Sequence, residues 1–396
     1  MNVYVDNAAT TKVSQTALAA MLPCFTESYG NPSSPHSVGQ EAAKLLNDAR
    51  KTVADYLGAE PSEIIFTSGG SEADNQALIT AAALGARKGK KHIISTKFEH
   101  HAILHALNKL EKEGYEVTFL DVHENGVVRL ADLEAALRHD TALVTIMYAN
   151  NEIGTIQPIA EIGALCREKG IIFHTDAVQA AGHLPINVKE QNIDMLSISA
   201  HKFHGPKGAG VFYCKRGLPI TAIIEGGAQE RGKRAGTENV PAIVGMAAAF
   251  KEACDNMSIN MPKVQLLREK LIDGILKLPE VILNGDREKR LPGNVNVSIK
   301  GIEGESLLLM LDIVGINASS GSACTSGSLD PSHVLLAIGL IHEVAHGSLR
   351  LSLSEYNTEE EIDYILEKLP PIVEKLRSMS PVWKRMKEEH KYDVQR

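Results

Sequence analysis

The chain has 396 residues, enough for two or three ordinary domains or for one large α/β unit. Hydrophobic residues make up 44% of it and charged residues 23%, a balance that is typical of globular proteins and too apolar for a disordered one. The formal net charge of −8 argues against a broad surface for nucleic acid or for an anionic membrane. No apolar run approaches the roughly 18 residues that a membrane helix needs, and the first residues do not resemble a secretory signal. The five cysteines are scattered without a Cys-x-x-Cys pair, which favours a reducing cytoplasm over a disulfide framework.

Helical and extended patterns alternate between about residues 36 and 250. Apolar residues from Val38 to Val53 recur at helical spacing, and Gly58 follows them as a stop signal. A buried strand is predicted at residues 64–66, and a helix at residues 71–87 follows it. Further strands are predicted at residues 93–95, 117–122, 143–147, 171–174, 195–199 and 211–214, and a strand-like run lies at 220–224. Strands this apolar, alternating with helices, predict an α/β fold with a mainly parallel sheet covered on both faces.

The pattern changes after about residue 260. The predicted elements there are a helix at residues 263–278, an alternating strand at 294–299, a helix at 305–311, a strand at 348–353 and a charged amphipathic helix from Thr358. The alternating strand predicts a smaller α+β domain whose sheet has one face in water. We therefore expect residues 16–260 to form a large α/β domain, and residues 1–15 and 261–396 to form the small one.

Two predicted strands end in chemically useful side chains. One apolar run ends at Asp176, and the next ends at His201 and Lys202, one strand-connection-strand step later. The carboxyl ends of such strands form the usual ligand site of an α/β sheet. A lysine and an aspartate in one crevice suit pyridoxal phosphate (PLP), because the lysine forms a Schiff base with its aldehyde and the carboxylate keeps its pyridine nitrogen protonated. The alternative is a surface lysine and a helix-capping aspartate.

A phosphate site is also predicted where the strand at residues 64–66 passes into its helix. Gly69, Gly70 and Ser71 fall at the N-terminus of that helix, where free N–H groups and the helix dipole favour an anion. The alternative is a tight turn with a serine cap. Residues 227–233 match G-x-x-x-x-G-K, but Arg234 stands where a nucleotide triphosphatase needs Ser or Thr for magnesium, so we discount that activity.

Cys324 differs from the other four cysteines because only small residues surround it. Its segment, about residues 318–330, has almost no apolar side chain to anchor it, which predicts a mobile, solvent-reachable loop where a reactive thiol is plausible. Downstream, Arg350 interrupts an apolar strand. Its planar guanidinium suits a carboxylate, either that of a substrate or that of an internal ion pair.

These motifs together resemble the cysteine desulfurases of the NifS/IscS group, within the class V aminotransferase family (PLP fold type I). The matching segments cover nearly the whole chain and lie at residues 4–11, 29–34, 67–72, 99–100, 150–154, 174–179, 199–208, 234–237, 320–326 and 350–353. The serine-rich segment around Cys324 is similar to the IscS/NifS subgroup rather than to the SufS-like one. The chain departs from the family pattern at Ser71, where many relatives have threonine, and at Ala235, where serine is frequent.

The resemblance implies a role for each matching residue. Lys202 would carry the cofactor and move protons, Asp176 would pair with the pyridinium nitrogen, Gln179 would bind the ring's phenolic oxygen, and His100 would stack on the ring as an acid/base. The phosphate would be held by Gly70, Ser71, Ser199 and His201, with Thr237 supplied by the neighbouring subunit of a homodimer. Asn151 and Arg350 would orient the substrate, Asn151 would also contact the cofactor, and Cys324 would be the nucleophile.

The activity implied by the resemblance is removal of sulfur from L-cysteine, giving L-alanine and a persulfide on Cys324. The sulfur would pass to iron–sulfur cluster assembly through an IscU/NifU-like scaffold protein, or to another acceptor, in the cytoplasm and without direct contact to nucleic acid or membrane. We expect no intrinsic metal site, although Cys324 could contact a cluster transiently. The charged tail at residues 383–396 would be a solvated helix end or a docking surface for the scaffold.

Other activities fit the same residues less well. An aminotransferase or a selenocysteine lyase shares the fold, but an aminotransferase needs no nucleophilic cysteine. A PLP-free scaffold or sulfur-carrier binding protein would retain the shape alone, and Lys202, Asp176 and Cys324 would then have no common purpose.

Overall fold

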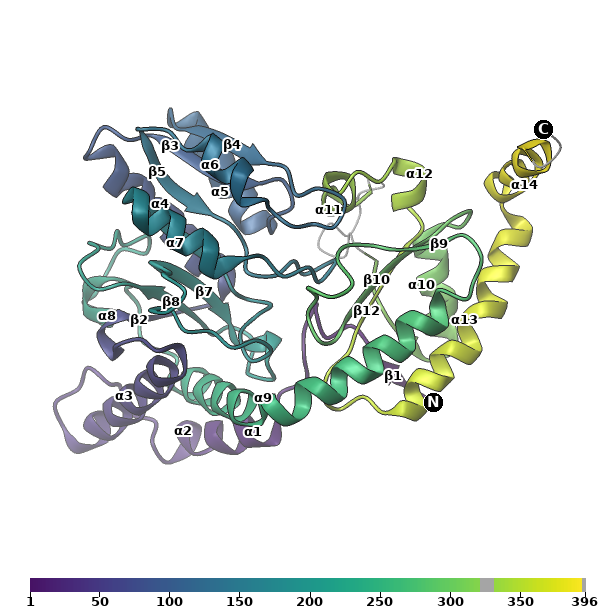
Figure 1. The fold of residues 1–396 in the computed structure, drawn as a ribbon. Coiled ribbons are helices and arrows are strands. Elements are labelled where there is room, and N and C mark those ends of the chain that lie inside the picture. The colour runs from purple at the N-terminus through teal and green to yellow at the C-terminus, as the bar shows by residue number, and fades with distance from the viewer. Residues whose placement is uncertain (321–330, 394–396) are drawn as a thin grey trace.

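The computed structural model describes residues 1–320 and 331–393, with side chains described up to residue 387. Cys324 and most of the predicted loop at residues 318–330 lie outside the described residues. Within the described part of the chain, the larger sheet has seven strands in the order β2-β8-β7-β6-β5-β3-β4 (Figure 1). Its strands are β2 (Ile64–Thr67), β3 (His92–Thr96), β4 (Glu116–Leu120), β5 (Thr141–Thr145), β6 (Ile172–Asp176), β7 (Met195–Ser199) and β8 (Gly210–Cys214). Strand β8 runs antiparallel to both β2 and β7, and the other adjacent pairs of this sheet are parallel, so the predicted α/β fold with a mainly parallel sheet is confirmed.

Helices cover both faces of this sheet, as the apolar strands predicted. One apolar core joins the sheet to α4 (Gly70–Ala86) and α5 (His101–Lys112). The opposite core joins it to α3 (Ser37–Leu57), α6 (Leu130–Ala136), α7 (Ile159–Lys169) and the first half of α9 (Val240–Ile275). His36 caps the N-terminus of helix α3, where its side chain accepts from Gly39 N–H, and the left-handed Gly58 caps the C-terminus. Two short helices, α1 (Gln15–Met21) and α2 (Pro23–Thr26), lie against α9.

A second group of elements surrounds a three-stranded sheet in the order β12-β10-β9. Its strands are β9 (Val281–Leu283), β10 (Asn294–Ile299) and β12 (Ser348–Ser352), and a separate pair joins β1 (Val3–Tyr4) to β11 (Ile316–Asn317). The helices are α10 (Gly304–Ile313), α11 (His333–Ala337), α12 (His342–Ala345), α13 (Glu359–Met379) and α14 (Pro381–Asp393). A third apolar core packs this sheet with β1, α10, α13 and the second half of α9.

Two sequence predictions about these elements were wrong, and a third was right only in part. The helix predicted at residues 263–278 is present as far as Ile275, but it is the second half of α9, which runs without a break through Pro262 and joins both groups of elements. Residues 220–224 form no strand. The small sheet does not have one face in water, because every residue of β10 and β12 is buried.

The polar side chains of β10 face the larger sheet rather than solvent. Asn294 Nδ2 and Asn296 Nδ2 each donate to the carbonyl oxygen of Glu152 at 3.0 Å. Glu152 belongs to the turn that follows β5, so these hydrogen bonds join the small sheet to the loops at the carboxyl end of the large one. The alternating polar residues of β10 are therefore buried against the turn that follows β5 and do not face water.

A buried ion pair fixes the segment after β8. Arg50 of α3 donates through both of its terminal nitrogens to Glu230, at 2.7 and 2.6 Å, and Glu230 also accepts from Phe66 N–H at the sheet edge. Glu230 lies in α8 (Gln229–Gly232), and it and Arg231 adopt left-handed backbone angles, φ 47° and 60°. Such angles are costly for residues with side chains. The bidentate pair offsets this strain and holds the segment that leads to Arg234 and Thr237.

Removing the Arg50 side chain should therefore destabilise the protein strongly. Arg50→Ala leaves the buried Glu230 carboxylate unpaired, for which we expect a loss of about 3–5 kcal/mol in the free energy of unfolding. Lys51→Ala is the matched control, because its pair with Asp55 is solvent-exposed and should contribute little. Urea denaturation of both variants tests this, and equal small losses would show that the pair does not hold the segment.

Candidate active site

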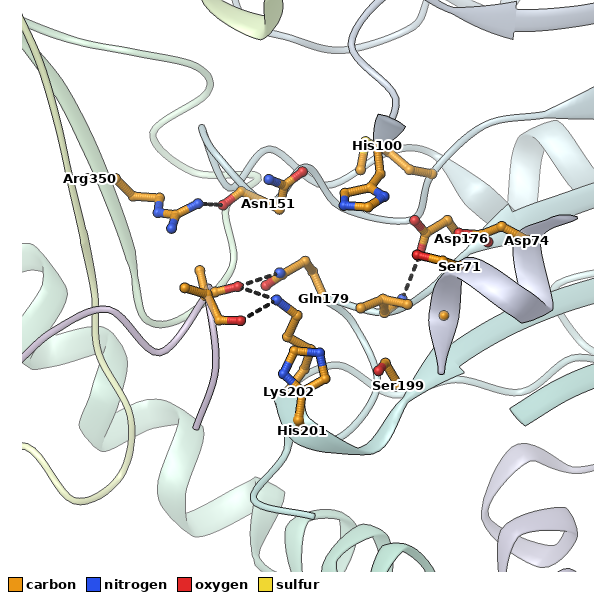
Figure 2. Close-up of a pocket in the computed structure, with 15 residues that line it drawn as sticks. Ser71, Asp74, His100, Asn151, Asp176, Gln179, Ser199, His201, Lys202 and Arg350 are labelled. Carbon is orange, nitrogen blue, oxygen red and sulfur yellow. Dashed lines mark hydrogen bonds between the residues drawn. The ribbon is translucent and has the colours of Figure 1, made fainter. Parts of the chain in front are cut away.

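The carboxyl ends of β6 and β7 open into a cavity of about 390 Å³ (Figure 2). Its walls bring together residues from β6, β7, the N-termini of α4 and α5, the turn after β5, and strand β12. The lining residues include Gly70, Ser71, Asp74, His100, Asn151, Asp176, Gln179, Ser199, His201, Lys202 and Arg350. All the residues predicted from the sequence to bind a cofactor or substrate line this one cavity, apart from Thr237.

Lys202 is aimed at the N-terminal segment. It ends the short 3₁₀ turn Ala200–Lys202 that follows β7, and its Nζ donates to the carbonyl oxygens of Ala8 at 2.6 Å and Ala9 at 2.8 Å. Gln179 Nε2 donates to the same Ala8 oxygen at 3.0 Å, as Figure 2 shows. Residues near the start of the chain therefore form part of the site.

Asp176 is a buried carboxyl at the end of β6. Burial raises its pKa to about 6, against the opposing effects of a hydrogen bond from Val178 N–H at 2.9 Å and of the Lys202 charge. Asp74 of α4 lies beside it, and burial together with the charge of Asp176 raises the pKa of Asp74 well above its ordinary value. Asp74 Oδ1 has no hydrogen-bond partner among the described residues. A cation placed at Asp176 would therefore relieve an unfavourable concentration of buried carboxyl groups.

His174 lies two residues before Asp176 on β6, and its side chain is buried next to Asp74. Its Nδ1 is hydrogen-bonded to Thr145 Oγ1 at 2.9 Å and its Nε2 to Ser197 Oγ at 3.1 Å. Burial lowers the pKa of His174 to about 3, so the ring is neutral and supplies no charge to the cavity.

An anion cradle lies at the opposite side of the cavity. Gly69 directly precedes helix α4. It provides no side-chain cap and adopts φ 155°, a conformation open only to glycine. The free N–H groups of the first turn, with Ser71, Ser199 and His201 beside them, suit a phosphate. A Cβ atom on Gly70 would come within 2.6 Å of Val178 Cγ2, so the Val178 side chain leaves no room for a side chain at position 70.

His100 lies over the cavity at the N-terminus of α5. Its Nδ1 accepts from Ala102 N–H at 3.1 Å, which assigns the proton of the neutral ring to Nε2. Burial, with the charge of Lys202, lowers the pKa of His100 to about 4. Burial and the same lysine also lower the pKa of His201 to about 4, so both rings are neutral at physiological pH.

Arg350 is buried in β12 with two of its three nitrogens engaged. Its Nη1 donates to Asn151 O at 3.1 Å and its Nη2 to Asp6 Oδ1 at 2.9 Å. Its Nε is buried and has no hydrogen-bond partner among the described residues. Of the two sequence alternatives for this arginine, the internal ion pair is present, and Arg350 also lines the cavity.

Thr237 lies apart from the other predicted residues. It is exposed, and it follows Arg234, which forms an ion pair with Glu72 at 2.8 Å. The chain's own cavity does not contain Thr237. Sequence reasoning assigned no role to Asp74, Asp6 or the Ala8 and Ala9 carbonyls. Asp74 carries no motif, because it is an acid one turn into a helix. Asp6, Ala8 and Ala9 fall in the matching segment at residues 4–11, but that segment does not show what they contact.

Comparison with known proteins identifies the family. The family model described as "Aminotransferase class-V" matches residues 3–365. The chain belongs to the class-V aminotransferase family. It is 58% identical over 384 residues to a curated "Cysteine desulfurase IscS" of Clostridium botulinum, with 96% of each chain covered. A solved "NIFS-LIKE PROTEIN" superposes with a TM-score of 0.90 at 42% identity, covering 95% of this chain and 100% of that one. A structure described as "SspA in complex with cysteine" has a TM-score of 0.80 at 36% identity and covers 90% of this chain and 100% of that one.

Within the class-V family, the chain falls among the PLP-dependent cysteine desulfurases, so the resemblance read from the sequence is confirmed. The cavity fits PLP on its own chemistry. An uncapped helix start suits the phosphate, the crowded carboxyls at Asp176 suit a cationic ring nitrogen, and Lys202 supplies the amine. Across residues 1–320 and 331–393, no helix is both long enough and apolar enough to span a membrane.

The close approach at Gly70 gives a test of the anion cradle. Gly70→Ala should weaken PLP binding roughly tenfold or more, because the new methyl group collides with Val178 and displaces the first turn of α4. The double variant Gly70→Ala/Val178→Ala removes the collision and should recover most of the affinity. Titration of apoprotein with PLP measures both, and equal losses in the single and double variants would show that the turn does not depend on this contact.

Proposed function

We propose that this cysteine desulfurase transfers the sulfur of L-cysteine to Cys324, leaving L-alanine and a persulfide. The observation that carries the proposal is the meeting of Lys202, Asp176 and Arg350 in one cavity. The chain that leads to Cys324 starts at the cavity wall, since Ser319 forms backbone hydrogen bonds with Arg350 in both directions, at 3.2 and 2.7 Å.

The cofactor would be held by the residues that the resemblance indicated. When bound, PLP supplies a ring that accepts electrons from the substrate α-carbon. Lys202 would hold its aldehyde carbon and then move the proton at the α-carbon, while Asp176 keeps the ring nitrogen cationic. The remaining contacts would come from Gln179 at the phenolic oxygen, His100 on the ring face, and Gly70, Ser71, Ser199 and His201 at the phosphate.

Arg350 would bind the substrate carboxylate. Asp6 and the Asn151 carbonyl hold two of its nitrogens and so fix the plane of the guanidinium group. Arg350 lines the cavity, so the guanidinium held in this way is placed to meet an incoming carboxylate. The similar SspA structure is a complex with cysteine, which supports this substrate. The side chain of Asn151 lines the same wall and would orient the substrate beside the cofactor.

The sulfur transfer itself needs a nucleophile from this chain. The thiolate of Cys324 would attack the substrate sulfur, forming an S–S bond as the C–S bond breaks. The electron pair of the broken bond remains on the substrate β-carbon, which takes up a proton to give alanine. The β-carbon is thereby reduced and the transferred sulfur oxidised, so no external oxidant or reductant is required.

The other four cysteines are poorly suited to this step. Cys24, Cys166 and Cys214 are buried, and Cys254 is partly so. Burial raises the pKa of Cys24, and it raises the pKa of Cys166, Cys214 and Cys254 to about 12, so little thiolate forms at neutral pH. Cys324 is left as the candidate nucleophile.

A homodimer would complete the phosphate site. Thr237 is exposed beside α9, and α1 and α2 lie against the same helix. Apolar side chains on and after these helices, Leu22, Phe25 and Tyr29, are more than half exposed. An exposed apolar surface of this kind is typical of an interface. We propose that a second copy covers it and receives Thr237 at its own cofactor.

The sulfur acceptor would be an iron–sulfur scaffold protein of the IscU/NifU kind or another sulfur carrier, in the cytoplasm. A docking surface is available at α14, where Trp383 packs on Gly301 and under the Arg377 guanidinium, 4.0 Å from the ring centroid. This packing fixes the start of the charged tail instead of leaving it fully solvated. An aminotransferase would use the same cofactor site but would not need Cys324.

Replacing Cys324 separates these activities. Cys324→Ala should retain PLP absorbance and lose alanine production from L-cysteine, because no thiolate remains to accept the sulfur. Cys254→Ala is the matched control and should keep full turnover. Mass spectrometry of the wild-type protein after exposure to L-cysteine should place one added sulfur on Cys324, whereas undiminished turnover in Cys324→Ala would exclude the proposed role.

The pKa of Asp176 gives a pH test of the cofactor site. A carboxyl whose folded pKa is raised from 3.8 to about 6 contributes stability below pH 4 that is lost as the pH rises through 6. A cationic ring nitrogen restores that stability, so PLP should raise the melting temperature more at pH 8 than at pH 5. In Asp176→Asn the difference between the two pH values should shrink. The same pH dependence in both proteins would contradict the pairing of Asp176 with the cofactor.

A further inference from the structure

Glu152 is a buried carboxyl that the proposed chemistry does not use. Its side chain and backbone are nonetheless fixed from three directions. Its N–H donates to Asn150 Oδ1 at 2.8 Å, and its carbonyl oxygen accepts from Asn294 and Asn296 of β10. Its Oε2 accepts a short hydrogen bond from the hydroxyl of Ser332. These hydrogen bonds hold both the backbone and the carboxyl group of Glu152 in one place.

Ser332 stands two residues beyond the segment that contains Cys324. Its Oγ caps α11 by accepting from Val334 N–H at 3.1 Å and Leu335 N–H at 3.3 Å, while its hydroxyl proton goes to Glu152. The next residue, His333, is hydrogen-bonded through Nε2 to the carbonyl oxygen of Glu99 at 3.0 Å. Glu99 directly precedes His100, so the chain is attached to the cofactor side of the cavity as soon as it leaves that segment.

The other end of the segment is attached to the substrate side. Ser319 pairs with the Arg350 backbone, and the Arg350 guanidinium donates to the carbonyl oxygen of Asn151 (Figure 2). Asn151 and Glu152 are consecutive. The C-terminal end of the segment is therefore bonded to Glu152 directly, and the N-terminal end is linked to the adjacent Asn151 through Arg350.

We propose that Glu152 is a positioning residue for sulfur transfer, and that through Ser332 it fixes the C-terminal end of the Cys324 segment relative to the substrate bound at Arg350. The inference rests on the proposed function of Cys324. Glu152 would not touch substrate or cofactor. It would act by setting where the nucleophile's segment is attached, which affects the transfer step and not substrate binding.

The charge of Glu152 is compatible with this role. Burial raises its pKa to about 7, and the Ser332 hydrogen bond and the Arg350 charge oppose that rise. In either protonation state one oxygen remains to accept from Ser332. The hydrogen bond rather than a fixed charge is therefore the feature that matters, and glutamine should be able to replace glutamate.

Three variants test the proposal on the PLP-bound enzyme. Glu152→Ala and Ser332→Ala should lower kcat for alanine formation about tenfold or more, with KM for L-cysteine and the PLP absorbance within about twofold of wild type. Glu152→Gln should retain kcat within about twofold. The rate at which iodoacetamide alkylates Cys324, followed by mass spectrometry, should change in both alanine variants and not in the glutamine variant.

Ser14→Ala is the matched control. Ser14 is also a buried serine that caps a short helix, accepting from Ala17 N–H at 3.1 Å, but it bears no relation to the Cys324 segment. Its loss should leave kcat unchanged. If Glu152→Ala does not fold, Ser332→Ala decides the matter alone.

The outcomes also separate this inference from the proposed function. Two outcomes would overturn the positioning role if Cys324→Ala is inactive. One is full turnover in both alanine variants. The other is a lowered kcat accompanied by a raised KM and weaker PLP binding. Full turnover in Cys324→Ala would instead overturn the proposed function itself.

Discussion

The burial of the Asp176 carboxyl is the constraint on which the rest of the site depends. An ionised carboxylate without a partner is costly to bury, and Asp176 shares its surroundings with Asp74, another buried carboxyl. Burial accordingly raises the pKa of Asp176 to about 6, because it disfavours the ionised form. A cation at the end of β6 offsets this cost, and PLP, the cofactor of this family, carries a ring nitrogen that can be that cation.

The fold places the complementary groups around that point. Strands β6 and β7 are parallel neighbours, so Asp176 and Lys202 emerge at the same edge of the sheet. Helix α4 begins at that edge and offers an anion site, while β12 of the small sheet contributes Arg350 from the opposite wall. Hydrogen bonds from Asn294 and Asn296 to Glu152 join the small sheet to the turn that follows β5. The same turn accepts hydrogen bonds from Ser332, which follows the segment that contains Cys324, and from Arg350, whose backbone pairs with Ser319 before that segment.

The sequence predicted the parts of this arrangement that local chemistry determines. Apolar strands that end in Asp176 and Lys202, and a glycine pair before Ser71, are local patterns, and the structure brings these residues to one cavity. The orientation of β10 was not predictable, because alternation shows that a strand has a polar face without showing what covers it. Asp74, Asp6 and Glu152 were missed for a similar reason. Their roles depend on neighbours 100 or more positions away in the chain, which no local pattern contains. Cys324 lies outside the described residues, so its role stays a prediction of the sequence.

Borohydride reduction of the PLP-bound protein, followed by digestion and mass spectrometry, tests the central claim most directly. If Asp176 and Lys202 hold the cofactor between them, the reduced pyridoxyl label will be found on the peptide that contains Lys202. A protein that binds PLP stoichiometrically but carries the label on another lysine, or carries none, would contradict the account.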